Sequence, residues 1–367
     1  MGINTVRVAP ACDIFRQHNS TRAPYMQNKA RTLSDIAKIA GVSDSTVSRA
    51  LSNNTLVNEK TRIKIQKIAA DNDFKVNTTA RNLRLQKSNT IAVVLLISSK
   101  ADQAVSDPFI LSILGVIADE LNEYGYDMLL STHKGSLQQL LNHYFDSKRA
   151  DGLIVFGQGD NGEEFSELLN SNRPIVVWGA NAQKNNYITV GTDNVLGGKL
   201  ATEHLIAQGR KKIAFAGHLS YETNLRYQGY KQALEKAGFN NACHLDIHFT
   251  YEDSYKVTRK MLTQGVFDYD AIFAASDTIA LGIIRALKET GIDIPKDVAI
   301  VGYDDIDVAA FTHPALTSVR QDTRAGGKHL VQNLFALMSN LAVESSVLPT
   351  ELMVRDSSVC KDSGQVP

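Results

Sequence analysis

Cysteines and long apolar runs are scarce in this chain, and each scarcity excludes a class of protein. The three cysteines (Cys12, Cys243 and Cys360) are odd in number and far apart, which excludes a disulfide framework and favours a reducing compartment. No run of about 18 apolar residues occurs, so we expect no membrane span. Residues 1–31 lack the apolar segment of a secretory signal, and we therefore expect a cytoplasmic protein.

A formal net charge of zero conceals two regions of opposite sign. Residues 1–90 hold 15 Lys and Arg against 6 Asp and Glu, whereas residues 91–367 hold 24 against 33. Such segregation is typical of a basic, phosphate-binding module joined to an acidic body. Residues 1–31 precede the first helical pattern and are expected to form a disordered extension, in which Met26 is an alternative start of translation.

The segment from residue 32 to residue 52 predicts two short helices joined by a tight turn, because its apolar residues recur at helical spacing. Thr32, with an acidic residue three positions later, has the arrangement of a capping box. Gly41 supplies the freedom that a sharp turn needs, and Ser43 can cap a second helix over 44–51. This is how a helix-turn-helix presents a recognition helix to the major groove; an ordinary helical hairpin is the alternative.

Two further segments extend this N-terminal region. Asn58 can cap a third helix that runs to Asn72 and closes a small three-helix core. Residues 77–88 (NTTARNLRLQKS) are basic and too short to hold a helix alone in water. They are therefore a candidate hinge that folds when a partner neutralises their charge, and a solvated linker is the alternative.

The body of the chain alternates short apolar runs with helical patterns, which predicts parallel sheets covered on both faces. Its roughly 270 residues exceed a usual single domain, so two subdomains are expected. The runs expected to be strands are 91–97, 126–131, 152–156, 174–178, 212–216, 271–274 and 298–302. The helical patterns include 110–124, 196–208, 226–238 and 278–290.

The enzyme alternatives fail on particular residues. The sequence GQGDNG at 157–162 follows a strand like a dinucleotide fingerprint, but Glu163 and Glu164 would repel a pyrophosphate at the helix start. His244 and His248 have metal-like spacing, but four residues along an expected strand span about 13 Å. We expect Asp304, Asp305 and Asp307 to form a solvated loop rather than a metal site. No enzyme, cofactor or metal is therefore expected.

Several long motifs in this chain resemble the LacI/GalR family of bacterial transcription regulators, in the family's order. The resemblance covers residues 32–360 and implies a homodimer that binds an imperfectly palindromic DNA operator. It also implies a periplasmic-binding-protein-like core of two lobes, with the ligand between them and crossover strands near Val190, Ser318 and Asn340. The motifs are GVSDSTVSRALS at 41–52, ARNL at 80–83, VGTDNVLGGKLATEHLIAQG at 190–209, RYQGYKQAL at 226–234, AIFAASDTIALGIIRAL at 271–287 and IPKDVAIVGYDDI at 294–306.

For DNA binding, the resemblance implies that Asp44, Ser45 and Arg49 read bases, and an arginine can pair bidentately with guanine. A helix cap is the alternative role of Asp44. Leu83 resembles the hinge leucine that wedges into the minor groove, although Val76 stands where the family often has proline. The full expected set is Thr32, Ser43, Asp44, Ser45, Thr46, Ser48, Arg49, Asn58, Asn77, Ala80, Arg81 and Leu83.

For the effector, the resemblance implies contacts by Arg226 and Asp277, with Phe249 stacking on the ligand and Phe109 lining the other lobe. A carboxylate and a guanidinium suit paired sugar hydroxyls, and Trp178 suits the apolar face of a pyranose ring. A place in the core is the alternative for Phe109 and Trp178. Carbohydrate is the preferred effector class, and a purine or nucleoside is the second.

The expected architecture is an all-α helix-turn-helix domain followed by an α/β two-lobed core. The function expected is sugar-controlled repression of carbohydrate-utilisation genes on the bacterial nucleoid; a sugar sensor without operator activity and a carbohydrate-active enzyme are alternatives. The tail from Asp356 has no leucine heptad, which favours a dimer over a coiled-coil tetramer. The expected segments are extension 1–31, helix-turn-helix domain 32–76, hinge 77–90, core 91–360 (lobe 1 at 91–189 and 320–340, lobe 2 at 190–319 and 341–360) and tail 361–367.

Overall fold

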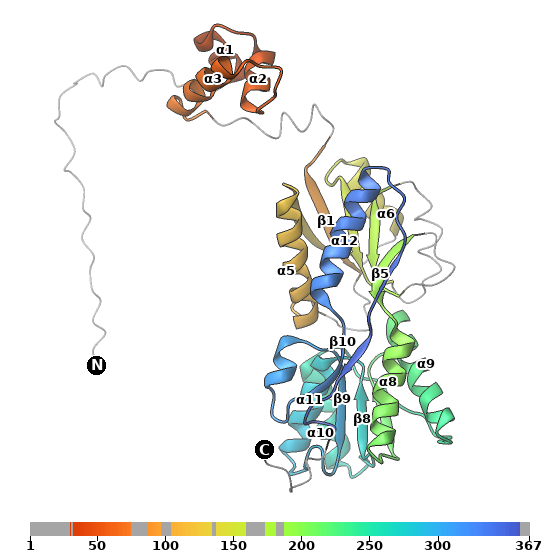
Figure 1. The fold of residues 1–367 in the computed structure, drawn as a ribbon. Helices are drawn as coiled ribbons and strands as arrows, with labels where there is room; N and C mark the ends of the chain where they lie inside the picture. Colours follow the sequence, from red (N-terminus) through yellow and green to blue (C-terminus); the bar gives the residue numbers. More distant parts are fainter. Residues whose placement is uncertain are drawn as a thin grey trace, which may run out of the picture. The chain divides into compact units, whose positions relative to one another are not determined.

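The computed structural model divides the chain into two units at Arg81 and Asn82 (Figure 1). The residues it describes are 30, 32–74, 87–96, 104–133, 137–158, 173–180 and 187–359. Most of the expected N-terminal extension, the hinge residues Asn77, Ala80, Arg81 and Leu83, and the C-terminal tail lie outside the described residues.

The first unit contains the three expected helices, α1 (Leu33–Ala40), α2 (Asp44–Leu51) and α3 (Glu59–Asp71). Its core is small, and Ile36, Val47 and Ile65 are fully buried at its centre. Two apolar residues of these helices, Ile39 in α1 and Ile63 in α3, are not in the core; they are 53% and 57% exposed. The N-terminal helices therefore follow the predicted boundaries, with a narrower buried face than the spacing of apolar residues predicted.

In the second unit, lobe 1 is built on a six-stranded sheet in which the strand order is β11-β5-β4-β3-β1-β2, all pairs being parallel. Successive residues of β1 point to opposite faces, so Ile91 and Val93 join one apolar cluster while Ala92 and Val94 join another. The sheet is thus covered on both faces, as expected. Its elements are β1 (Thr90–Leu96), α5 (Pro108–Glu123), β2 (Asp127–His133), α6 (Leu137–Leu141), η1 (Asn142–Asp146), β3 (Gly152–Phe156), β4 (Ile175–Trp178), β5 (Ile188–Thr192), α12 (Thr323–Met338) and β11 (Ser346–Leu348).

Lobe 2 has a second six-stranded sheet, ordered β12-β10-β9-β8-β6-β7, in which only the β10–β12 pair is antiparallel. The antiparallel edge strand was not expected from the alternating pattern. Its elements are α8 (Asn194–Ala207), β6 (Ile213–Ala216), α9 (Tyr221–Lys236), β7 (Cys243–Leu245), α10 (Tyr251–Thr263), β8 (Ala271–Ala274), α11 (Asp277–Lys288), β9 (Ala299–Asp304), η2 (Asp307–Phe311), β10 (Thr317–Arg320) and β12 (Glu351–Met353).

Within the described residues the chain passes between the two sheets at three crossovers. The first follows Thr192, between β5 and α8; the second is at 321–322, between β10 and α12; the third is at 349–350, between β11 and β12. The third crossover comes about ten positions later than Asn340, because α12 ends at Met338 and β11 still belongs to the sheet of lobe 1. No described helix has the length and apolar character needed to span a bilayer.

Helices α8 and α9 pack backbone to backbone through two glycines. A Cβ atom added at Gly198 would lie 2.0 Å from the carbonyl oxygen of Arg226, and one added at Gly229 would lie 2.1 Å from the carbonyl oxygen of Val195. Neither carbonyl can give way without moving its helix, so the contact fixes α9 against α8.

We therefore predict that Gly229→Ala lowers the free energy of unfolding by about 1–3 kcal/mol through overpacking. Gly115→Ala is the matched control, because its added Cβ would meet no atom within 4 Å and alanine favours a helix. Urea unfolding at fixed protein concentration measures both variants. Equal stabilities of the two variants would contradict this account of the α8–α9 contact.

Candidate functional site

The residues of α2 that were expected to contact DNA share an exposed surface in the first unit. Asp44, Ser45 and Arg49 are exposed. Ser43 is the N-cap, and its hydroxyl oxygen accepts a hydrogen bond from the Thr46 backbone N–H at 3.3 Å and lies 2.9 Å from the Ser45 hydroxyl. The helix is therefore capped by Ser43 rather than by Asp44, which leaves the carboxylate of Asp44 on the outer surface.

The helices around α2 are held by the caps that the sequence predicted. Thr32 forms a complete capping box on α1, and the side chain of Asn58 accepts from the Lys60 N–H at 3.0 Å at the start of α3. Gly41 ends α1 in the left-handed region, with φ at +72°, and makes the turn toward α2. Exposed hydroxyls at the N-terminus of α2 combine with the positive end of its dipole, an arrangement suited to anionic phosphates.

Arg226 is the centre of the second candidate site, at the lobe 2 side of the boundary between the lobes. It lies in α9, and its guanidinium carbon is 3.7 Å from the centre of the Tyr303 ring. Its Nε donates to the Asn194 side-chain oxygen at 2.8 Å, and one terminal nitrogen donates to the Ala275 carbonyl at 2.6 Å. The same nitrogen is 3.9 Å from a carboxylate oxygen of Asp304. These partners hold a cation that is only 7% exposed.

Asp304 is a residue that sequence reasoning missed, because it was assigned to a solvated loop. It ends β9 with φ at +109° and is 7% exposed. Burial raises its pKa to about 7, Arg226 acts in the opposite direction, and Asp107 raises the pKa further. The available signal was its position after the apolar run of β9, since ligand residues follow the carboxyl ends of strands in α/β folds.

The neighbouring aspartates also differ from the solvated-loop interpretation. Asp305 accepts from Arg320 Nε at 2.9 Å and from an Arg355 terminal nitrogen at 2.6 Å, so it joins β9, β10 and the segment after β12. Of the three aspartates Asp304, Asp305 and Asp307, only Asp307 is exposed. The solvated-loop prediction was therefore wrong for Asp304 and Asp305. Among the described residues, no cluster of three or more metal-ligating side chains occurs.

Asp277, the other expected effector residue, is fully buried inside lobe 2. One carboxylate oxygen accepts from the Ser318 hydroxyl at 2.6 Å, and the other accepts from the Ile306 N–H at 2.9 Å. Burial raises its pKa well above the usual value, and the charge of Asp304 adds to this. Both described partners of Asp277 belong to lobe 2 itself, so these contacts are structural ones that join α11 to β10.

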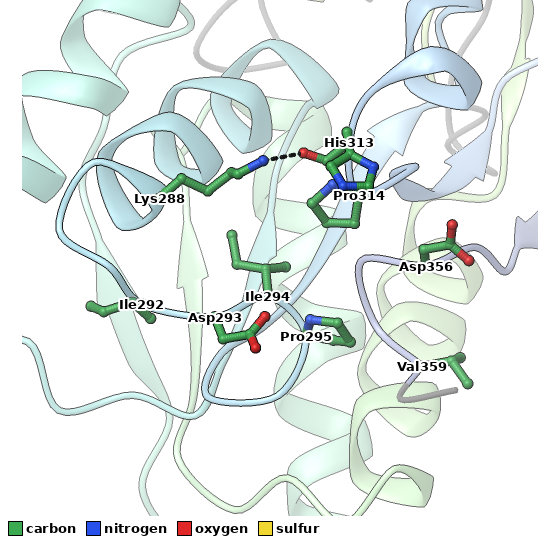
Figure 2. Close-up of a pocket in the computed structure, with 9 residues that line it drawn as sticks. All are labelled: Lys288, Ile292, Asp293, Ile294, Pro295, His313, Pro314, Asp356 and Val359. Carbon is green, nitrogen blue, oxygen red and sulfur yellow. Dashed lines mark hydrogen bonds between the residues drawn. The ribbon is translucent and has the colours of Figure 1, made fainter. Parts of the chain in front are cut away.

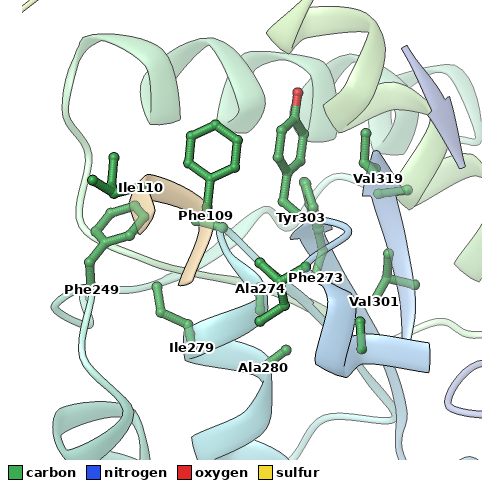
Figure 3. Packing of buried hydrophobic residues seen from close by; sticks show 14 of the residues in the cluster. Phe109, Ile110, Phe249, Phe273, Ala274, Ile279, Ala280, Val301, Tyr303 and Val319 are labelled. Carbon is green, nitrogen blue, oxygen red and sulfur yellow. The ribbon is translucent and has the colours of Figure 1, made fainter. Parts of the chain in front are cut away.

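The expected aromatic residues occupy two different environments. Trp178 packs in the core of lobe 1, where its ring centre is 5.7 Å from that of Phe109 and where a Cβ added at Gly326 would lie 2.4 Å from its ring. This packing supports the core alternative for Trp178. Phe109 and Phe249 come from opposite lobes and belong to one apolar cluster, and Figure 3 shows Phe109 between Phe249 and Tyr303.

Two carboxylates form hydrogen bonds between the lobes. Asp107 caps α5 of lobe 1, and its other oxygen accepts from the hydroxyl of Thr278 in lobe 2 at 3.1 Å. Glu222, in the first turn of α9, accepts from the backbone N–H of Gln158 in lobe 1 at 3.1 Å. Burial raises the pKa of both carboxyl groups. Gln158 belongs to the G-x-G-x-x-G sequence, and a backbone N–H of that sequence thus binds a carboxylate of this chain. Residues 159–162 of the sequence lie outside the described residues.

The two histidines with metal-like spacing do not share the expected strand. β7 ends at Leu245, so His248 lies in the loop beyond it. The ring of His248 is 6.1 Å from that of His218, whereas His244 is 2.7 Å from the Gly217 carbonyl oxygen. The prediction that His244 and His248 lie in the same strand was therefore wrong, because His248 is outside it.

A separate cavity of about 390 Å³ lies at the C-terminal end of α11 (Figure 2). Lys288, at one side of it, donates to the backbone carbonyl of His313 at 2.8 Å. None of the residues expected to bind an effector lines this cavity. Its lining residues are Lys288, Ile292, Asp293, Ile294, Pro295, His313, Pro314, Asp356 and Val359.

Comparisons with known proteins match both units of the chain. A family model described as bacterial regulatory proteins, lacI family, matches residues 32–77, and one described as a periplasmic binding protein-like domain matches residues 202–358. The HTH-type transcriptional regulator CelR of Thermobifida fusca is 31% identical over 345 residues, which are 90% of this chain and 100% of that protein.

Two solved structures are similar over most of the chain. The lac repressor dimer bound to operator and the anti-inducer ONPF has a TM-score of 0.78 and 27% identity, covering 90% of this chain and 99% of that one. A complex of transcriptional regulator CelR with cellobiose has a TM-score of 0.64 and 29% identity, covering 89% of this chain and 100% of that one.

The raised pKa of Asp304 predicts a specific dependence of stability on pH. Since its pKa is about 7 in the folded protein and 3.8 in the ordinary case, the folded state keeps a proton that the unfolded chain has lost between these values. This contribution to the free energy of unfolding is fully present below about pH 4 and falls as the pH rises through about 7. Asp304→Asn should remove it, as urea unfolding of both proteins from about pH 5 to pH 8 would show. Parallel pH profiles would contradict the assignment.

Proposed function

Because this chain belongs to the LacI family of bacterial regulatory proteins, we propose that it represses carbohydrate-utilisation genes and that a sugar bound between its lobes controls its affinity for DNA. Family membership makes the chain a DNA-binding transcriptional regulator and not an enzyme. The proposal places it on the nucleoid in the cytoplasm.

The operator is read by the exposed face of α2 and by the hinge. Asp44 and Ser45 begin the helix and Arg49 follows one turn later, so all three are available to base edges in a major groove. Polar side chains around this face supply helix caps and groups that can contact the phosphate backbone. They are Thr32, Ser43, Thr46, Ser48 and Asn58. Leu83 is the proposed minor-groove wedge. Asn77, Ala80 and Arg81 belong to the same hinge motif of the resemblance and are proposed to contact DNA with it.

The assembly proposed is a homodimer, because a palindromic operator requires two copies of the recognition helix related by a two-fold axis. The related lac repressor was solved as a dimer on its operator. Two modules of this size also supply the many phosphate contacts on which affinity at physiological salt depends.

One observation carries the effector class: a buried guanidinium and carboxylate, Arg226 and Asp304, lie 3.9 Å apart beside the aromatic ring of Tyr303. Adjacent sugar hydroxyls donate to a carboxylate and accept from a guanidinium, while apolar sugar faces pack on aromatic rings. Phe109 and Phe249 add apolar surface from both lobes. The relative CelR, which was solved with cellobiose, supports a carbohydrate here.

The test is fluorescence anisotropy of the purified full-length protein on DNA from upstream of its own and neighbouring genes. It is run at fixed salt, because phosphate contacts make affinity depend on salt. Sequence-specific binding that cellobiose or another sugar of a mono- and oligosaccharide panel releases would support the proposal. Binding enhanced by a purine would replace the sugar with the second effector class, and no specific binding would contradict the repressor.

Removal of Arg49 should weaken and broaden operator recognition. Arg49→Ala is expected to cost about 1–3 kcal/mol of operator binding and to relax the preference at one base position. Arg62→Ala, on α3, is the matched control, because Arg62 is 3.9 Å from Glu59 and is not in the recognition helix. Anisotropy on operator and scrambled duplexes measures the preference. An unchanged preference in Arg49→Ala would contradict base readout by this residue.

Removal of Arg226 should abolish the response to the effector while operator binding persists. Arg226→Met keeps most of the side-chain volume but removes the hydrogen bonds that a sugar would share, so we expect at least about a tenfold loss of effector affinity. Arg285→Met is the control, since Arg285 is half exposed and pairs with Glu289 outside the proposed site. Operator release is titrated with the releasing sugar; normal release from Arg226→Met would move the effector site elsewhere.

A further inference from the structure

Five buried side chains form a closed ring of polar contacts, which we call the crossover ring: Thr192, Asn194, Arg226, Asp304 and Gln321. The Thr192 hydroxyl donates to the Gln321 side-chain oxygen at 3.0 Å, and the Gln321 amide nitrogen donates to Asp304 at 2.6 Å. Asp304 faces Arg226 at 3.9 Å, and Arg226 Nε donates to Asn194 at 2.8 Å. The Asn194 amide nitrogen closes the ring on the Thr192 carbonyl at 3.3 Å.

The crossover ring joins the proposed effector pair to two of the three crossovers. Thr192 is the last residue of β5 in lobe 1, and Asn194 begins α8 in lobe 2, so these two residues flank the first crossover. Gln321 follows β10 and begins the second crossover. Arg226 and Asp304 supply the other two ring positions. The groups proposed to hold the effector are thus bonded directly to two of the segments that connect the lobes.

The five members of the crossover ring are no more than 7% exposed. If one of them loses its hydrogen-bond partner in the ring, a solvent water therefore cannot take the place of that partner. Gln321 shows the constraint most clearly: its oxygen must face the Thr192 hydroxyl and its nitrogen must face the Asp304 carboxylate, so one amide orientation satisfies both. A buried polar group left without a partner costs about 1–3 kcal/mol, so a change at Asp304 must be met by a change at the crossovers.

Resting on the proposed function, we propose that Thr192, Asn194 and Gln321 are positioning residues. They couple the effector pair, Arg226 and Asp304, to the crossovers that connect the lobes. They do not contact the sugar. When sugar hydroxyls engage Arg226 and Asp304, the contacts of this pair with Asn194 and Gln321 readjust. Thr192 and Gln321 transmit the readjustment to the first and second crossovers, which set the angle between the lobes.

The test separates effector binding from operator release in the full-length protein, with cellobiose as the first probe. Isothermal titration calorimetry without DNA gives cellobiose affinity, and anisotropy gives operator affinity with and without saturating cellobiose. The ratio of those operator affinities is the coupling, typically about 5–150-fold in allosteric proteins. Thr192→Val, which removes the hydroxyl and keeps the shape, should bring the ratio to within about twofold of one while cellobiose affinity changes less than about threefold.

Three further variants show whether the crossover ring itself is responsible for the coupling. Thr192→Ser restores the hydroxyl and should restore the ratio. Thr189→Val makes the same change three positions earlier in β5, where the buried Thr189 hydroxyl has no hydrogen-bond partner among the described residues, and should keep the wild-type ratio. Gln321→Met, which breaks the ring at another member, should lose the ratio as Thr192→Val does and decides the matter if Thr192→Val fails to fold.

Three results would overturn the coupling role. These are normal release from both Thr192→Val and Gln321→Met, an equal loss in Thr189→Val, or loss of cellobiose binding itself in Thr192→Val. Failure of wild-type release by every sugar tested would instead contradict the proposed function. In that case Asp304→Asn is compared with wild type by hydrogen exchange without ligand: faster exchange at the Asp193 and Asp322 amides supports the coupling, and unchanged exchange overturns it.

Discussion

Burial of one guanidinium organises much of the effector-binding core. A buried cation is strongly unfavourable unless it is paired and hydrogen-bonded. The burial of Arg226 in lobe 2 therefore requires hydrogen-bond acceptors around its guanidinium group. Those acceptors come from three places far apart in the sequence: Asn194 after a crossover, the Ala275 carbonyl after β8, and Asp304 at the end of β9. Satisfying one charge therefore aligns the start of α8 with the ends of two strands.

The same requirement links packing to recognition. Gly198 and Gly229 let α8 and α9 approach until a backbone carbonyl of each lies where a side chain would otherwise stand. This close contact places Arg226 beside Asn194 and over Tyr303. Asp305, held by Arg320 and Arg355, fixes the backbone next to Asp304 in the same way. Neither set of contacts touches the proposed ligand, yet both determine where its partners lie.

Local patterns predicted what depends on near neighbours in the chain, and they failed where distant segments meet. The caps Thr32, Ser43 and Asn58 were predictable because each bonds a backbone N–H two or three residues away. The resemblance assigned Asp277 to the effector site, and Asp304 was expected in a solvated loop. The sequence does not show that the Ser318 hydroxyl and the Ile306 N–H donate to the Asp277 carboxylate. The late third crossover was missed because its strand, β11, has only three residues. Nothing in the sequence order could indicate the crossover ring.

The packing of Trp178 has a practical consequence for spectroscopy. This is the single tryptophan of the chain, so all of its indole emission comes from one place in lobe 1. The ring rests on Gly326 in the first turn of α12, the helix that begins immediately after the second crossover. A shift of α12 relative to β4 changes the surroundings of that indole. The unlabelled protein therefore carries its own optical reporter of movement at the second crossover.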